Sequence, residues 1–331
     1  MIDRKTYIGG PDAAAIVGVN PFRTPMDVFM SKNTETGVFE MNDAMRMGLA
    51  LETPIALTAA EKHGHIVFKP NPEQIIHPDR AWHGGSPDFI IQDEPGFYEV
   101  KTVGRRMAHH WGDDENTDEV PPYVLVQIHW YAPLLPETTW CLVHALIAGE
   151  YREYMIHTDA ELVTEIVGQC QEFWENHIVK DIPPPMDESN VDSWKRYIAR
   201  KFKQNVEPMK IPAPDIAPIA LRLARVKFLE AWIENETDRL ENFMKLEIAD
   251  ADGMECPDFR VLWKKSKNTE KTDWQSVAKV MNPEAEIIKM YTTVIPGPRK
   301  FYFKWKGEEI SFGDTKKLLE ANDGTDTDST E

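Results

Sequence analysis

The chain has 331 residues, of which 42% are hydrophobic, and a formal net charge of -18. This length and composition predict a folded protein of one large or two ordinary domains and exclude a disordered chain. No apolar run reaches the length of a membrane span, and the first residues lack the pattern of a secretion signal. The cysteines at 141, 170 and 256 fit no disulfide or zinc framework. We therefore expect a reducing, cytoplasmic setting without membrane contact.

The charge is unevenly distributed. Residues 1–193 carry 13 Lys and Arg against 31 Asp and Glu, residues 194–306 carry 22 against 16, and residues 307–331 carry 2 against 8. This balance argues against a generic nucleic-acid binder. An acidic first half is consistent with clustered metal-binding carboxylates, and equally with a solvated surface.

The elements predicted in the first half are helices and short strands. Residues 42–63 form a helix that we expect to be interrupted or bent at Pro54. The segment from Gly84 to Pro87 is typical of a turn and leads into a hairpin of residues 88–91 and 97–102. Further strands are predicted at 65–70, 74–78, 138–147 and 150–158, and further helices at 123–135 and 160–179. This order predicts an α/β domain in which helices cover a sheet.

Three consecutive prolines at 183–185 indicate a domain boundary. We predict a first domain over 1–185, a Pro-rich linker with a basic helix over 186–218, and a helical and small α+β extension over 219–318. Long and short helices are expected at 219–248 and near 274–281, with strands around FRVLWKK and KFYFKW. An acidic tail over 319–331 is expected to be disordered.

Four polar signals in the first half share one order along the chain. They are Glu52 four residues after Gly48 on the first helix, Asp88 at the start of a strand, Glu99 and Lys101 on the next strand, and Gln127 with Tyr131 on the following helix. Strand alternation places Glu99 and Lys101 on one face, opposite Tyr98 and Val100, and an i, i+4 spacing places Gln127 and Tyr131 on one helix face. Each residue alone is more often solvated or in the core, but together they predict a catalytic constellation.

This order resembles the PD-(D/E)XK nucleases of the RecB-nuclease type. The segments IGGPDAAAIVGVNPFRTP, MRMGLALE, GGSPDF, YEVKT and PPYVLVQIHWYAPLL resemble, more closely, the YqaJ-type viral recombinase family, whose members are related to phage lambda exonuclease. The resemblance extends over about residues 7–180. It implies a PD-(D/E)XK nuclease core, with a central mixed β-sheet flanked by helices, followed by a C-terminal α+β extension.

The resemblance also implies roles for individual residues. Glu52, Asp88, Glu99 and the carbonyl of Val100 would hold Mg²⁺, with Mn²⁺ as a substitute and two ions per site; hard cations of this kind prefer oxygen ligands. Lys101 would orient or deprotonate the attacking water, with its pKa lowered by metal charge. Gln127 and Tyr131 would position the phosphate or support Lys101.

Basic side chains are the expected contacts to DNA. They are Arg4, Arg23, Arg105, Arg106, Lys195, Arg196 and Arg200. The last three belong to the basic helix at 193–203, for which a solvated face and a phosphate contact remain equal alternatives. In lambda-type relatives a small hydroxyl residue and an upstream Arg hold the substrate's 5′-phosphate, whereas the matching position here is Pro11. Only Arg4 or Arg23 could then supply charge.

The function predicted from the resemblance is a Mg²⁺-dependent DNA exonuclease of phage-recombination type, with 5′–3′ polarity on duplex ends. The implied partners are double-stranded DNA, a single-strand annealing protein and further copies of the chain in a trimer. A phage-encoded chain would work in the host cytoplasm. Two alternatives remain open: a structure- or site-specific endonuclease, and a non-catalytic DNA-binding assembly subunit. A Cas4-like nuclease is disfavoured because its iron–sulfur cluster needs four cysteines.

Overall fold

The computed structural model describes residues 2–33, 41–112, 119–203, 209–266 and 273–293. The chain divides into two compact units, Met1–Lys201 and Phe202–Glu331, which are considered separately. The predicted strand KFYFKW and the predicted acidic tail lie outside the described residues. Within the described ranges, no helix is both long enough and apolar enough to span a membrane.

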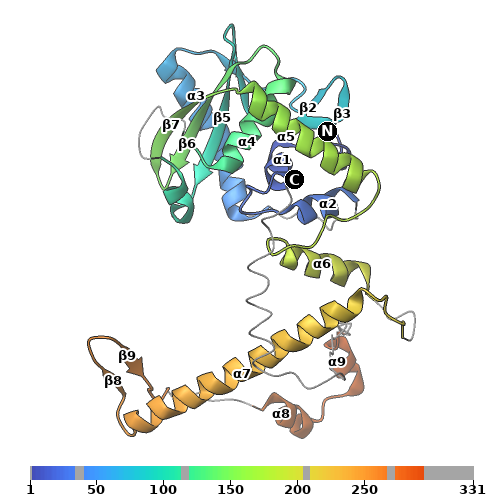
Figure 1. Cartoon of the computed structure of the whole chain (residues 1–331). Helices are drawn as coiled ribbons and strands as arrows, with labels where there is room; N and C mark the ends of the chain where they lie inside the picture. Colours follow the sequence, from blue (N-terminus) through green and yellow to red (C-terminus); the bar gives the residue numbers. More distant parts are fainter. Residues whose placement is uncertain (1, 34–40, 113–118, 204–208, 267–272, 294–331) are drawn as a thin grey trace, which may run out of the picture. The chain divides into compact units, whose positions relative to one another are not determined.

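A five-stranded mixed sheet forms the centre of the first unit (Figure 1). Its strands, in spatial order, are β1 (Val67–Phe68), β4 (Phe89–Ile91), β5 (Gly96–Val103), β6 (Trp140–Ile147) and β7 (Glu150–His157). Strands β5 and β6 run parallel, whereas the other neighbours are antiparallel. The hairpin predicted around residue 95 is confirmed as β4 and β5, with Phe89 opposite Tyr98.

Helices cover both faces of this sheet. On one face, Ala56, Ala59 and Ala60 of α3 (Asp43–His63) pack against Tyr98 and Val100. On the other face, α1 (Gly10–Ile16), α4 (Pro122–Tyr131) and α5 (Ala160–Phe173) share a core with Phe97 and with β6. The predicted mixed α/β fold, with a central sheet flanked by helices, is therefore confirmed. The unit also contains η1 (Arg4–Thr6), α2 (Pro25–Asn33), β2 (Ile75–His77), β3 (Arg80–Gly85), η2 (Arg105–His110), η3 (Ala132–Leu134), the π-helical turn η4 (Trp174–Ile178) and α6 (Val191–Lys201).

Helix α3 is continuous through Pro54, so the predicted interruption there is wrong. Proline removes one backbone hydrogen-bond donor, but residues that cap α3 at both ends and the packed alanines Ala56, Ala59 and Ala60 stabilise the helix. Asn42 accepts the N–H of Met45 at 2.9 Å at the start, and Gly64 (φ 73°) ends the helix in the left-handed conformation. A Cβ at Gly48 would lie 2.9 Å from Oγ1 of Thr102, which supplies the packing reason for a glycine inside this helix.

The turn predicted from Gly84 is wrong for its two glycines. Gly84 and Gly85 end β3, where they lie opposite Ile76 and Ile75 of β2 in a separate two-stranded sheet. Glycine pairs favour turns, but here both glycines are buried strand residues. The turn into β4 is therefore confined to Ser86 and Pro87, immediately before Asp88.

The second unit contains the long helix α7 (Ile216–Ile248) and a short hairpin of β8 (Gly253–Glu255) and β9 (Arg260–Leu262). Two short helices follow, α8 (Trp274–Met281) and α9 (Ala285–Met290). The helices predicted at 219–248 and 274–281 and the strand in FRVLWKK are confirmed. Helix α6, which was predicted as part of a linker, belongs to the first unit, where Tyr197 packs with Phe29 and Phe173.

A polar network lies on the α3 side of the sheet. Glu153 of β7 accepts hydrogen bonds from Lys62 at 2.9 Å and Tyr151 at 2.6 Å, and it lies 2.9 Å from the ring of His63. Burial raises the pKa of Glu153, but these hydrogen bonds outweigh it and lower the pKa to about 2. Behind them, His144 is fully buried, and burial lowers its pKa to about 3. The end of α3 is thus attached to the sheet by a charged glutamate and a neutral histidine.

The buried His144 predicts a stability that depends on pH. Its pKa is about 3 in the folded chain against 6.5 in the unfolded chain, so acid protonates the unfolded chain first. Between pH 7 and pH 5 this histidine should remove about 2 kcal/mol from the free energy of unfolding. In His144→Gln, urea titrations at the two pH values should show a pH-dependent loss that is smaller by that amount. The neighbouring Leu146→Ala, which removes no titrating group, should keep the wild-type difference; equal slopes for all three proteins would contradict the prediction.

Candidate active site

Glu99 and Lys101 lie on the face of β5 that is covered by α4. Glu99 is 1% exposed, and Nζ of Lys101 donates to its Oε1 at 2.6 Å. The same ammonium group donates to Oε1 of Gln127 at 3.1 Å. The predicted shared face of Glu99 and Lys101 is therefore confirmed, and both side chains reach the following helix.

Gln127 and Tyr131 form a buried chain of hydrogen bonds to Glu99. Nε2 of Gln127 donates to Oε1 of Glu99 at 2.7 Å and lies 3.0 Å from the Tyr131 hydroxyl. Helix α1 passes close to this pair, since a Cβ at Gly10 would lie 2.7 Å from Cγ of Gln127 and 2.9 Å from the Tyr131 hydroxyl oxygen. The glycine at the start of α1 thus allows both side chains to keep their places.

Asp88 lies just before β4 and accepts the backbone N–H of Val100 at 2.8 Å. Burial raises the pKa of Asp88 well above its ordinary value, and the negative charges of Glu99 and Glu52 raise it further. Lys101 and the Val100 N–H lower it only in part. The pKa of Glu99 is also raised, chiefly by burial, although Lys101 opposes this. The site therefore concentrates carboxylates beyond what its lysine neutralises.

Glu52 reaches this group from α3, where Nζ of Lys69 donates to its Oε1 at 2.8 Å. The side chain of Lys69 also lies over the ring of Phe89, 5.4 Å from the centroid. Sequence reasoning missed Lys69, because it stands in a short strand-like run with no motif of its own. Its pairing with Glu52 brings a second lysine to the carboxylates.

On balance, the protein groups around Lys101 raise its pKa. Burial lowers this pKa, but the negative charges of Glu99 and Asp88 and the hydrogen bond to Glu99 outweigh it. Lys101 is therefore a charged ammonium group in this environment. As a charged group it can orient a water or a phosphate oxygen, whereas removal of a proton would require its pKa to fall when a metal ion binds nearby.

The carboxylates of this site are candidate ligands for a metal ion. In the described part of the chain, no three His, Cys, Asp or Glu side chains are arranged so that they could hold a metal ion as they stand. The chemistry of the donors nevertheless fits a hard cation: Glu52, Asp88 and Glu99 offer carboxylate oxygens, and Oε2 of Glu99 is buried with no hydrogen-bond partner. A buried acceptor without a partner is costly and often marks a functional atom. The ligand atoms are thus of the kind that Mg²⁺ prefers, and one of the carboxylates, that of Glu52, is paired with Lys69.

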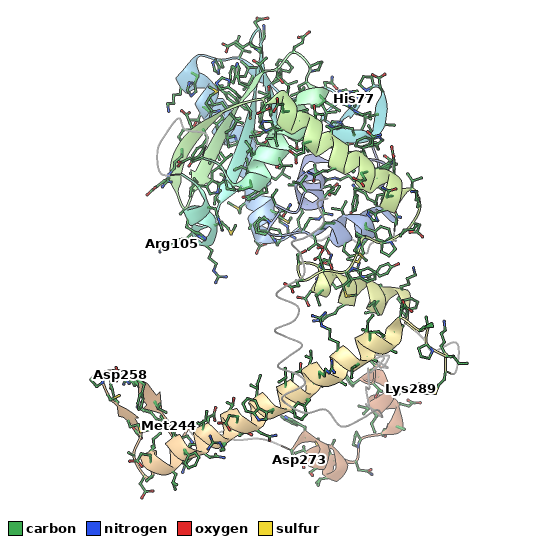
Figure 2. All side chains as sticks on the ribbon, in the orientation of Figure 1. His77, Arg105, Met244, Asp258, Asp273 and Lys289 are labelled. Atoms are coloured by element: carbon green, nitrogen blue, oxygen red, sulfur yellow. The ribbon has the colours of Figure 1, made fainter. Side chains whose placement is uncertain are left out.

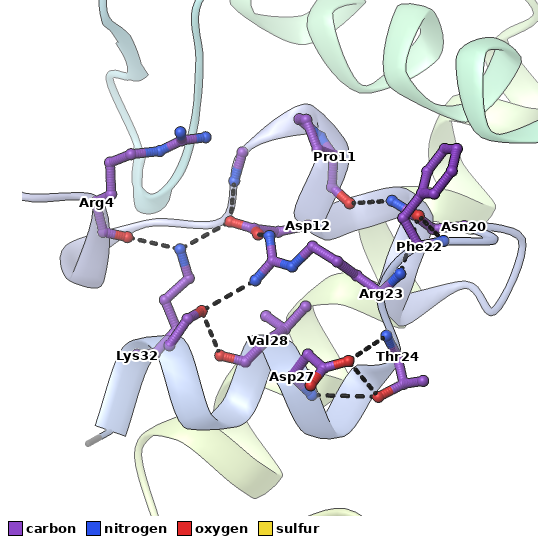
Figure 3. A network of polar contacts seen from close by, with 12 residues as sticks. Arg4, Pro11, Asp12, Asn20, Phe22, Arg23, Thr24, Asp27, Val28 and Lys32 are labelled. Carbon is purple, nitrogen blue, oxygen red and sulfur yellow. Dashed lines mark hydrogen bonds and ion pairs between the residues drawn. The ribbon is translucent and has the colours of Figure 1, made fainter. Parts of the chain in front are cut away.

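Two predicted DNA-binding arginines lie beside a buried aspartate near the start of α1 (Figure 3). Asp12 is 2% exposed and forms ion pairs with Arg23 and with Lys32, whose Nζ lies 2.8 Å away. Burial raises the pKa of Asp12, but the charges of Lys32 and Arg23 outweigh it and lower the pKa. Arg23 is thereby committed to a structural cluster, whereas Arg4 is exposed. The Pro11 carbonyl accepts from Nδ2 of Asn20 at 3.2 Å.

The other predicted DNA-binding residues are distributed over η2 and α6. Arg105 and Arg106 are exposed directly after β5, and Figure 2 shows the Arg105 side chain pointing away from its ribbon. On α6, Arg196 donates to Asp27 of α2 at 2.7 Å, and Lys195 pairs with Asp192 on its own helix. Arg200 is exposed and has no ion pair among the described side chains. The basic helix thus uses one of its three predicted contacts to pack within the unit.

Comparisons with known proteins find a matching domain model and a related protein. Residues 2–134 match the family model of the YqaJ-like viral recombinase domain. The YqaJ protein of Bacillus subtilis (strain 168) is 26% identical over 271 residues, which cover 80% of this chain and 82% of that protein.

Two solved structures are similar to this chain at a lower sequence identity than the Bacillus protein. An alkaline exonuclease from Laribacter hongkongensis has a TM-score of 0.44 and 20% identity, over 60% of this chain and 96% of that chain. A phage-related exonuclease from Haemophilus somnus 129PT has a TM-score of 0.41 and 14% identity, over 53% and 96% of the respective chains. The resemblance to the YqaJ-type viral recombinase family that the sequence motifs predict is thus matched by the family model of the YqaJ-like viral recombinase domain over residues 2–134.

Proposed function

We propose that the first unit is a Mg²⁺-dependent DNA nuclease that degrades duplex DNA from its ends. The observation that carries the proposal is the buried Glu99, whose Oε2 has no hydrogen-bond partner. Its charge and that of Glu52 add to burial in raising the pKa of Asp88, so the three carboxylates lie close together. A purely structural ion pair between Glu99 and Lys101 would not need two further carboxylates beside it. Such crowding lowers stability and is typical of a site that binds cations. The YqaJ-like domain supports the exonuclease reading.

The cation ligands in this proposal are Glu52, Asp88, Glu99 and the carbonyl of Val100. When bound, Mg²⁺ neutralises phosphate charge and lowers the pKa of a water. Asp88 is held by the Val100 N–H, and Glu99 is held through one oxygen only, so the other oxygen is free for a ligand. Glu52 becomes available when Lys69 releases it.

Lys101 orients the attacking water or a phosphate oxygen in this proposal. Its ammonium group is held by Glu99 and Gln127 and can still offer a third hydrogen bond. Gln127 and Tyr131 act through Lys101 and Glu99, which they hold in place. Arg4 is the side chain that holds the DNA end in this proposal, because Arg23 is already paired with Asp12. A single-strand annealing protein and a homo-oligomer remain its proposed partners.

The function is tested by incubating the full chain with linear and covalently closed duplex DNA, each with Mg²⁺ or with EDTA. We expect linear DNA to be degraded only with Mg²⁺ and closed circles to remain intact, since a circle offers no end. Cleavage of circles would support the endonuclease alternative instead. No cleavage with Mg²⁺ or Mn²⁺ would leave only a non-catalytic DNA-binding role.

Linear substrates with and without a 5′-phosphate should be degraded at similar rates. The reason is that Pro11, which has no hydroxyl group, stands at the position of the hydroxyl residue that holds the 5′-phosphate in lambda-type relatives.

Asp88→Asn should separate activity from stability. Loss of residues that only support metal ligands costs about 10- to 100-fold, so loss of a ligand should reduce the rate more than about 100-fold. The unfolding temperature in EDTA should not fall, because the substitution removes a buried charge whose pKa is raised by burial and by Glu99. Thermal unfolding with and without Mg²⁺ supplies the second measurement, and stabilisation by Mg²⁺ should disappear. The matched control Glu61→Gln, exposed on α3, should change neither value; wild-type cleavage by Asp88→Asn would remove Asp88 from the site.

The exposed Arg105 and Arg106 should contribute phosphate contacts. Each contact adds about 0.9 to the slope of log K against log salt concentration, so Arg105→Ala/Arg106→Ala should reduce that slope by about 2. Fluorescence anisotropy with labelled duplex DNA, in Ca²⁺ or EDTA to prevent cleavage, measures the slope. Lys180→Ala, an exposed lysine outside the predicted contacts, should leave it unchanged. An unaltered slope in the double variant would show that η2 does not contact DNA.

A further inference from the structure

The second unit carries an exposed apolar stripe along α7. The side chains of Ile219, Val226, Ile233 and Leu240 are 61%, 41%, 56% and 51% exposed. They recur every seven residues over most of the helix, the spacing that keeps side chains on one face of helices that pair with each other. Phe243, 59% exposed, continues this stripe one turn further. Solvated helices do not need such a row, and contiguous apolar patches mark interaction surfaces.

The stripe is distinct from the least exposed face of α7. The buried Ala224 and the partly buried Leu221 and Phe228 lie on the opposite side of the helix. At the carboxyl end, Leu240 and Met244 border a groove with Leu262 and Trp263 of the β8–β9 hairpin. Figure 2 marks Met244 at this end of α7. The apolar surface therefore continues from the helix onto the hairpin.

The charges of α7 indicate what covers the stripe. Between Ile216 and Leu229 the helix carries Arg222, Arg225 and Lys227 and no acidic residue. Between Glu230 and Ile248 it carries six Asp or Glu residues against two Lys or Arg residues. Arg222 and Arg225 have no ion pair with any described residue, whereas Lys227 approaches Glu230 at 3.7 Å. One end of the helix is thus positive and the other negative.

We propose that α7 is a dimerisation helix that pairs antiparallel with α7 of a second copy of this chain. Antiparallel pairing places the positive half of each helix against the negative half of the other, while the apolar stripes face each other. Parallel pairing would instead align the like-charged halves, which costs binding energy. The two-fold arrangement uses the same surface on both copies, as is usual in dimers.

Pairing along α7 is tested first by the mass of the full chain in solution, measured by light scattering. The wild type should have an even multiple of 38.0 kDa, which is two copies, or six where the first unit also forms the trimer that the resemblance implies. Ile233→Asp should halve that mass because it places a charge in the middle of the stripe. Asn235→Asp, on the opposite face of the same turn, is the matched control and should leave the mass unchanged. A monomeric wild type, or a mass unaffected by Ile233→Asp, would overturn the proposal.

The orientation is tested by disulfide cross-linking in a Cys256→Ser background, since Cys256 is the exposed cysteine among the three. Val226→Cys and Leu240→Cys proteins should each cross-link poorly alone and well when mixed, because antiparallel helices bring position 226 near position 240 of the other copy. Parallel helices would give the reverse pattern, with each variant cross-linking to itself, and would overturn the antiparallel proposal. Circular dichroism of each variant checks that α7 remains helical, so a lost cross-link cannot be mistaken for unfolding.

Discussion

The cost of burying the Glu99 carboxylate determines the arrangement of the first unit's centre. An isolated buried charge is strongly destabilising, so it must be paired and hydrogen-bonded. Lys101 supplies the opposite charge from the same strand, and Gln127 supplies a donor from α4. Tyr131 holds Gln127 in turn. Strand β5 and helix α4 must therefore lie against each other in one register, and the close approach of Gly10 on α1 is part of the same packing.

The same region is also under electrostatic strain. Glu52, Asp88 and Glu99 bring three carboxylates together against two lysines, Lys69 and Lys101. Burial raises the pKa of Asp88, and the charges of Glu99 and Glu52 raise it further. The opposite side of the sheet is, by contrast, fully compensated: Glu153 accepts from Lys62 and Tyr151, and its pKa is low. Helix α3 connects the two, since its first half carries Glu52 and its last turn is held by Glu153. The hydrogen-bonded Glu153 thus fixes the helix that carries Glu52 to the candidate site.

Local periodicity was sufficient to predict the parts of the site that lie within single elements. Alternation along β5 placed Glu99 with Lys101, and helical spacing joined Gln127 to Tyr131. Contacts between distant residues could not be predicted in this way. The pairing of Lys69 with Glu52 and that of Arg23 with Asp12 depend on how helices pack, which no short motif encodes. The strand ending at Gly85 was missed because glycine's turn propensity outweighed a strand pairing that only the folded chain reveals.

The parallel pairing of β5 and β6 has a consequence for the order of the motifs. A parallel pair cannot be joined by a tight turn; the chain must return across one face of the sheet before it begins the second strand. Here the returning crossover contains α4, and it covers the face that bears Glu99. Any chain with this topology is therefore obliged to place a helix over its Glu-x-Lys strand soon afterwards in sequence. The position of the helix that carries Gln127 and Tyr131, soon after the Glu-x-Lys strand, thus follows from the topology, whereas the identity of these two residues does not.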